Sequence, residues 1–317
     1  MLQFAHVFAA SLYIGCATSG SDLSDGLGGD EQAVTTTYVE IQEFGSTPAE
    51  DAWHSINSKL QGEFRRVCGD TFCEGEFSNL TALRLYCSVT SKHATIHDCA
   101  WAFTASRHEV DTVTAAVIPN AVTYQCHFKP ETTGPALIAL LQGSDDALHA
   151  ALPGMGSIYD TLGDCFARPI GTTPATVSPV ATTYVDAADY YASAAGQATW
   201  AAALVNLHTG FDNVCGDTFC GSDYADVQAL DLGCSVTKSS GNLKTCIWNF
   251  GGSFTTIAKS GKLAVVSRTW SCPVIVHGTI GQMISVLTSA TDTSDAIHRP
   301  LPGGMAAYDS IAGCVTR

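Results

Sequence analysis

The seven residues VCGDTFC occur twice in this chain of 317 residues, at 67–73 and at 214–220. The cysteines that follow recur at the same spacing of 147 residues, and such self-similarity is typical of a duplicated module. Four cysteine pairs align without a gap, and two more align after a short deletion or insertion: Cys68 and Cys215, Cys73 and Cys220, Cys87 and Cys234, Cys99 and Cys246, Cys126 and Cys272, and Cys165 and Cys314. The sequence therefore predicts two tandem copies of one cysteine-rich module.

The repeat also predicts the domain boundaries. We expect a first module at 34–169 and a second at 180–317, joined by a linker at 170–179 whose prolines and threonines favour an extended spacer. A module of about 135 residues can bury a core of its own. The two modules are therefore expected to fold independently of each other.

Periodicity predicts the elements of each module. Apolar residues at helical spacing from Trp53 to Val67 indicate a helix that ends near Cys68, with a counterpart at 200–214. Alternating apolar residues at 83–89, at 99–103 and around Cys126 indicate three half-buried antiparallel strands, and short helices follow. The fold class is therefore α+β: a helix, an antiparallel meander and short C-terminal helices. This order of elements resembles a cystatin-like roll, although no cystatin sequence motif is present.

The cysteine count predicts the covalent chemistry. Thirteen cysteines divide into one before the modules and six in each, an even number that indicates three disulfides per module in an exported chain. Metal and redox sites are the alternatives, but both are usually built from CxxC pairs, and the spacing in VCGDTFC is longer. Cys87 and Cys99 would face each other across a hairpin, and Cys165 is assigned to Cys126, which leaves Cys68 with Cys73. The second module would repeat these pairs: Cys234–Cys246, Cys272–Cys314 and Cys215–Cys220.

Residues 2–15 form an apolar run that is too short for a comfortable membrane span and suits the core of a signal peptide. Its last four residues, LYIG, together with Cys16, resemble the lipobox of bacterial lipoproteins. The resemblance implies a signal peptide at 1–15, a lipid on Cys16, and anchoring to the bacterial cell envelope outside the cytoplasm. The polar residues at 16–33 are expected to be a disordered tether. Plain secretion and a cytoplasmic location are the alternatives.

Composition restricts the partners. The formal net charge is −15, charged residues make up only 14% of the chain, and lysine and arginine do not gather in any segment. Nucleic acids and anionic membrane surfaces are bound by clustered basic residues, so the sequence argues against both. The expected partners are the membrane, through the lipid anchor, and an unknown protein or small-molecule ligand.

One histidine motif occurs in both modules. Asp146 lies three residues before His149, and Asp295 lies three residues before His298. On a helical turn this spacing would let the carboxylate orient the imidazole, as at a general base or a ligand site. The alternative is a turn in which the histidine bonds to the backbone. Because Ser157 aligns with an alanine, no shared nucleophile accompanies the pair, and no catalytic residue is assigned.

A set of oxygen-bearing side chains around the cysteine loop is also shared. Such side chains can hold Ca²⁺, although their spacing is not that of an EF-hand loop and turn formation explains them equally well. Calcium is the one cofactor considered. The candidate ligands are Asp70, Glu76, Asn79, Asp217, Asp223 and Asp226.

These features predict a membrane-anchored, exported, non-enzymatic lipoprotein with a binding or structural role. The alternative is a secreted or anchored hydrolase that uses His149 or His298.

Overall fold

The computed structural model describes residues 36–45, 47–69, 71–73, 77, 79–166, 183–215, 219–220, 224, 226–289 and 293–315. The predicted signal peptide, the tether with Cys16 and the linker at 170–179 lie outside the described residues. Thr36–Arg317 form one compact unit. In the part of the chain that the structure describes, no helix combines the length and the apolar character of a membrane span.

The first half of this unit is α+β, as predicted. Its strands form one antiparallel sheet in the order β1-β2-β3-β4. The short strand β1, which pairs with β2, is an addition to the expected elements. In chain order the elements are β1 (Tyr38–Glu40), η1 (Ile41–Glu43), α1 (Thr47–Cys68), β2 (Thr81–Thr90), β3 (Ile96–Val110), β4 (Val117–Phe128), α2 (Gly134–Gly143) and α3 (Ile158–Phe166).

The second half has a sheet of the same kind, in the order β5-β6-β7-β8. A single helical turn replaces the 3-10 helix after its first strand, and an additional 3-10 helix precedes its last helix. The elements are β5 (Tyr184–Asp186), α4 (Ala187–Tyr190), α5 (Ala194–Cys215), β6 (Gln228–Thr237), β7 (Leu243–Ile257), β8 (Leu263–Pro273), α6 (Ile280–Thr288), η2 (Thr293–His298) and α7 (Ala307–Val315).

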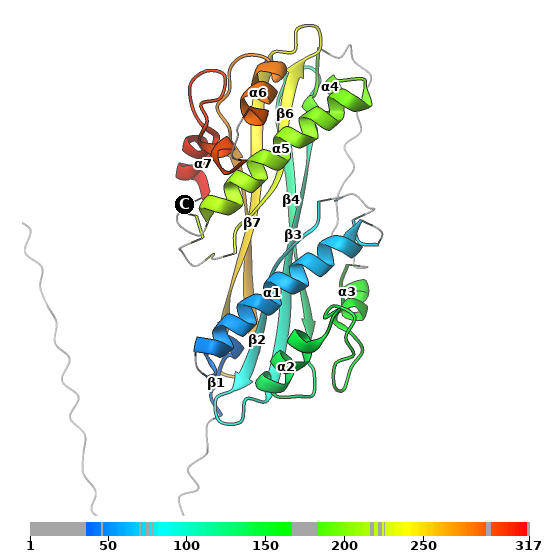
Figure 1. Ribbon diagram of the computed structural model, residues 1–317, viewed down its shortest axis with the longest axis vertical. Coiled ribbons are helices and arrows are strands. Elements are labelled where there is room, and N and C mark those ends of the chain that lie inside the picture. The colour runs from blue at the N-terminus through cyan, green and yellow to red at the C-terminus, as the bar shows by residue number, and fades with distance from the viewer. Residues whose placement is uncertain are drawn as a thin grey trace, which may run out of the picture. The chain divides into compact units, whose positions relative to one another are not determined.

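Each half has a core between its long helix and one face of its sheet. Figure 1 shows α1 lying across the first sheet and α5 lying across the second. The apolar residues of α1 that follow helical spacing, such as Trp53 and Phe64, are buried together with Trp101 and Phe103 of β3. The second half buries a matching set of residues: Trp200, Leu207, Phe211, Trp248 and Phe250.

Six disulfides reinforce these cores, and they join the six pairs expected from the sequence. Cys87 and Cys99 are direct partners in the antiparallel register of β2 and β3, with their Cα atoms 4.1 Å apart. Cys126–Cys165 connects β4 to α3. Cys68–Cys73 closes the turn after α1, where the N–H groups of residues 71–73 bond to the carbonyl of Cys68. The VCGDTFC motif is thus a disulfide-closed helix end.

The second face of each sheet is covered at its central strands, so the prediction of half-buried strands was wrong for β2 and β3, whereas β4 and β8 do alternate between buried and exposed residues. Tyr86, Ala100 and Ala102 of the first sheet form a buried cluster with Leu263 and Val265 of the second. They are buried because the two sheets contact each other through these faces. A half on its own would expose this cluster to water, so the expectation of independent folding has to include that cost.

Two matched hydrogen bonds tie each sheet to a turn of the opposite half. The buried Ser88 hydroxyl donates to the carbonyl of Gly261, with 2.5 Å between the oxygens. Ser235, at the corresponding position 147 residues later, is also buried and donates to the carbonyl of Ala115 at 2.6 Å. Since a buried hydroxyl without a partner is costly, each serine favours the docked arrangement. The two halves therefore hold each other through equivalent contacts.

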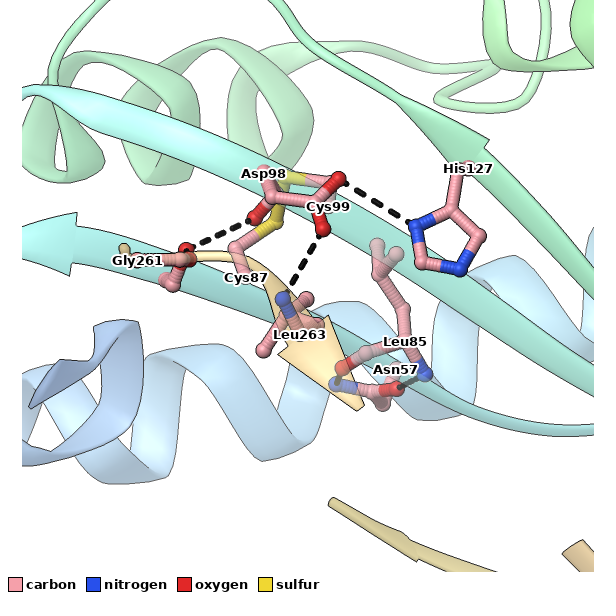
Figure 2. The surroundings of a disulfide bond; sticks show 9 residues. Asn57, Leu85, Cys87, Asp98, Cys99, His127, Gly261 and Leu263 are labelled. Atoms are coloured by element: carbon pink, nitrogen blue, oxygen red, sulfur yellow. Dashed lines mark hydrogen bonds and ion pairs between the residues drawn. A yellow bond between two sulfur atoms is a disulfide. The ribbon is translucent and has the colours of Figure 1, made fainter. Parts of the chain in front are cut away.

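A carboxylate beside the Cys87–Cys99 disulfide adds a contact between the halves. Asp98 accepts a hydrogen bond from the Leu263 N–H at 2.9 Å, and its other oxygen lies 3.2 Å from His127 (Figure 2). Burial alone would raise the pKa of Asp98, but the hydrogen bonds from His127 and Leu263 outweigh burial and lower it. Asp98 is therefore a charged group that joins β3 to the start of β8.

Two glycines allow the sheets to approach closely. A Cβ atom at Gly251 would overlap the Thr104 side chain, and one at Gly233 would overlap the ring of His108. Thr104 and Gly251 are corresponding positions in the two halves, so they face each other where the sheets meet. The space between the two sheets holds the Thr104 side chain but no second side chain opposite it. Glycine at position 251 therefore lets the sheets pack closely.

Candidate functional site

The first of the two predicted aspartate–histidine pairs lies on an exposed turn between α2 and α3. His149 Nδ1 is 3.0 Å from Asp146 Oδ2, and the His149 ring lies against Tyr159 with 4.5 Å between the ring centres. The hydrogen bond from His149 lowers the pKa of Asp146. Ser157 is also engaged nearby, because its hydroxyl and its N–H both bond to Asp160 at the start of α3.

The second pair lies in η2. His298 packs on Tyr308, with 4.6 Å between the ring centres, and both His298 and Asp295 are exposed. In each half the histidine thus lies on the surface against a tyrosine. Its use in a hydrolase stays a prediction.

Of the candidate calcium ligands, only Asn79 and Asp226 are described; Asp70, Glu76, Asp217 and Asp223 lie outside the described residues. Asn79 accepts a hydrogen bond from the Ser106 N–H at 2.9 Å. Asp226 accepts the equivalent bond from the Ser253 N–H at 2.6 Å, and it also accepts one from the Ser253 hydroxyl. These two side chains hold the loop against the long strand of their sheet. Calcium binding by the full set stays a prediction.

A cavity of about 470 Å³ lies in the second half, between α5 and β6, and strand β3 of the first half contributes to its wall. None of the four residues of the aspartate–histidine pairs is among its lining residues. Its volume falls within the usual range for small-molecule sites. The lining consists of Asn79, Thr81, His108, Asp186, Ala188, Trp200, Ala201, Leu204, Val205, His208, Thr209, Asp212, Ala229, Leu230, Asp231 and Leu232.

One part of the cavity wall is apolar. Leu230 and Leu232 of β6 are buried, and Trp200 and Leu204 of α5 face the same space. Val205, on α5, is 62% exposed. The wall therefore offers apolar surface that a ligand could cover.

The polar part of the wall is centred on His108, which enters from the first half. His108 Nδ1 lies 2.5 Å from Asp231 Oδ2, and its Nε2 bonds to Asp186 Oδ2. Burial alone would lower the pKa of His108, but the two carboxylates outweigh burial and raise it to about 10. His108 is therefore a cation at neutral pH, held by one carboxylate on each side.

The four oxygens of these two carboxylates are not used equally. Asp186 Oδ1 caps the short helix α4 by accepting from the Ala188 N–H at 2.7 Å. Asp231 Oδ1, by contrast, is buried and has no hydrogen-bond partner within the described part of the chain. A buried carboxylate oxygen that lacks a donor is costly, and here it belongs to a residue that lines the cavity.

Two further titratable groups line the wall. Burial lowers the pKa of His208, although a hydrogen bond with the backbone of Leu230 opposes this shift. Burial raises the pKa of Asp212, while the positive charge of Arg65 opposes that rise. A positive charge near Asp212 thus stabilises the ionised form of its carboxyl group.

Larger side chains occupy the corresponding place in the first half. Gln42 and Arg84 bond to each other there, and Tyr86 spans to Ser253 with 3.0 Å between the oxygens. The positions that match these three residues in the second half carry shorter side chains: Ala188, Asp231 and Gly233. The cavity is a consequence of these substitutions.

Sequence reasoning missed the cavity for an identifiable reason. Histidines were retained as candidates only where both modules had one, and the position that matches His108 holds Thr255. The available signal was the opposite one, a position where the modules differ sharply in size or charge. Arg84 against Asp231 and Tyr86 against Gly233 are such positions.

Comparisons with protein-family models, with curated proteins and with solved structures each find no match for this chain.

The paired carboxylates predict a specific pH dependence. Because the folded pKa of His108 is raised from about 6.5 to about 10, its contribution to stability is complete below about pH 6.5 and is lost as the pH rises toward 10. We expect urea unfolding with intact disulfides to show a loss of up to about 1.4 kcal/mol per pH unit between about pH 7 and 9. His108→Gln should flatten this slope.

The matched control is His93→Gln, since His93 is exposed in the turn between β2 and β3. It should retain the slope of the wild type. An equal slope in wild type and His108→Gln would contradict the ion-paired arrangement.

Proposed function

We propose that this chain is an exported, lipid-anchored, non-enzymatic protein that binds a ligand in the cavity of its second half. The cavity carries the proposal. It combines apolar surface from α5 and β6 with polar groups at one side, the usual composition of a small-molecule site. The six disulfides support export, because such bonds persist in oxidising compartments.

The difference between the halves supports a binding role for one of them. The first half fills the corresponding place with the hydrogen-bonded side chains of Gln42 and Arg84, whereas in the second half Asp231 lines a cavity. A filled site would be the more stable choice, since cavities cost stability. We infer that the second half keeps its cavity for a ligand.

The chemistry of the cavity supports binding over catalysis. His108 is a cation with both ring nitrogens engaged by carboxylates, so it has no free lone pair with which to act as a general base. The hydrolase alternative would rely on His149 or His298, and these lie outside the cavity wall.

The anchor and the location complete the proposal. A lipid on Cys16 would attach the protein to the bacterial cell envelope outside the cytoplasm, and residues 16–33 would hold the folded body away from the membrane. A role for calcium at the candidate ligands of the cysteine loops is part of the same proposal. The excess negative charge supports a partner other than nucleic acid.

The anchor predicts the mature N-terminus. After expression in bacteria and extraction from membranes, intact-mass analysis should find a chain that begins at Cys16 and carries the mass of added acyl groups. Cys16→Ser should release the protein from the membrane fraction, because the substitution removes the acylated thiol. A wild-type chain that begins elsewhere without a lipid would refute the anchor and leave plain secretion.

The binding site predicts the result of a cavity-filling variant. We expect a neutral apolar fluorophore, N-phenyl-1-naphthylamine, to bind the purified protein with enhanced emission, and Ala201→Trp to weaken that binding by at least about tenfold. Ala201 is exposed on α5 and lines the cavity, so a larger side chain there fills the space without disturbing the core.

His54→Trp is the matched control, because His54 is the corresponding exposed position on α1. It should bind the fluorophore as the wild type does. Equal weakening by both variants, or by neither, would argue against the cavity as the site.

A further inference from the structure

We infer that the contact between the two sheets is a selective recognition surface, through which the first half accepts a second half as its partner and excludes a copy of itself, with or without the linker. The inference goes beyond the proposed function, because it concerns the partner of each half and not the ligand of the cavity. Two observations carry it: the halves hold each other through equivalent contacts, and they differ in side-chain size and charge where they meet.

The equivalent contacts have the form of an interface between two copies of one module. Ser88 bonds to the carbonyl of Gly261, and Ser235 bonds to the carbonyl of Ala115, the position that corresponds to Gly261. Such reciprocity is typical of a contact with two-fold symmetry. These hydrogen bonds are therefore open to any pair of halves, and other residues have to decide which pair forms.

Side-chain size excludes a pair of two first halves. Thr104 lies opposite Gly251, which is the corresponding residue of the second half, and a Cβ atom at Gly251 would overlap the Thr104 side chain. In a pair of first halves Thr104 would meet a second Thr104. The sheets would have to move apart, and their close packing would be lost.

Side-chain charge excludes the same pair at another position. His108 bonds to Asp231 of the second half, and its ring occupies the room that Gly233 leaves. The first half carries Arg84 and Tyr86 at the positions of Asp231 and Gly233. In a pair of first halves the His108 ring would therefore meet the Tyr86 side chain and the positive charge of Arg84. Overlap and like charge both oppose this pair.

A pair of two second halves lacks a cation. Asp186 and Asp231 would face Thr255, the residue that corresponds to His108. Two largely buried carboxylates would then lose the positive charge to which both now bond. Gly251 would also meet a second Gly251 and leave a gap where Thr104 now packs. A mixed pair, of one first and one second half, satisfies both positions.

Cleavage of the folded chain tests recognition without the linker. A protease site is introduced within residues 170–179, and the folded protein is cut with its disulfides intact. We expect the two fragments to elute together at the mass of the whole protein. Cut protein is then mixed with an isotope-labelled cut copy, kept in moderate urea so that the fragments exchange, and returned to buffer. Native mass spectrometry should find mixed pairs at least about tenfold more abundant than pairs of like halves.

A double substitution should create the excluded pair. Thr104→Gly together with His108→Thr gives the first half the residues that the second half carries at these positions, Gly251 and Thr255. Pairs of two first halves should then become as abundant as mixed pairs. This result is a gain of association, which a failure to fold does not produce.

Thr95→Gly together with His93→Thr is the matched control. It makes the same two exchanges at exposed positions between β2 and β3, and it should give mixed pairs only. If the first double variant does not fold, Thr255→His gives the second reading, because it would supply a cation to Asp186 and Asp231 in a pair of second halves. Pairs of second halves should then appear.

Three results would overturn the inference. The first is separation of the wild-type fragments into monomers after cleavage. The second is a wild type in which like pairs are as abundant as mixed pairs after exchange. The third is a folded variant, either the double substitution in the first half or Thr255→His in the second, that still forms mixed pairs only.

Discussion

The contact between the two sheets is the constraint on which the rest of the molecule depends. Each sheet is covered by its long helix on one face, and its central part contacts the other sheet through the second face. The contact needs small residues where the sheets meet, and Gly251 opposite Thr104 meets that need. It also buries Ser88 and Ser235, whose hydroxyls make their shortest hydrogen bonds to carbonyls in turns of the opposite half. Docking therefore satisfies polar groups that each half alone would leave without these partners.

The candidate site follows from the same contact. His108 belongs to a strand of the first half, yet its partners Asp186 and Asp231 belong to the second half. Gly233 leaves room for its ring, where the first half has Tyr86 at the corresponding position. A single change in side-chain size thus admits a cation from one half into the wall of a cavity in the other. The site cannot form in a separated half.

Local pattern was enough to predict most of the architecture. The helical spacing of Trp53 and Phe64 and the alternation around Cys87 and Cys99 reflect burial against α1 or within one sheet, so periodicity reveals them. The cover on the second face was missed because its residues include Ala100 and Ala102, small side chains that do not stand out in a pattern of large apolar residues. The likeness to a cystatin-like roll, the lipid anchor and calcium binding stay predictions.

Hydrogen exchange tests the central claim, that both sheets belong to one cooperative unit, most directly. With disulfides intact, native-state exchange is followed by mass spectrometry as the denaturant concentration rises. The amides of β3 and β7 should become exchangeable at the same denaturant concentration and with the same free energy of opening, because opening either sheet exposes the cluster of residues that both sheets bury. Opening of β7 at a concentration where β3 stays protected, or the reverse, would contradict the account.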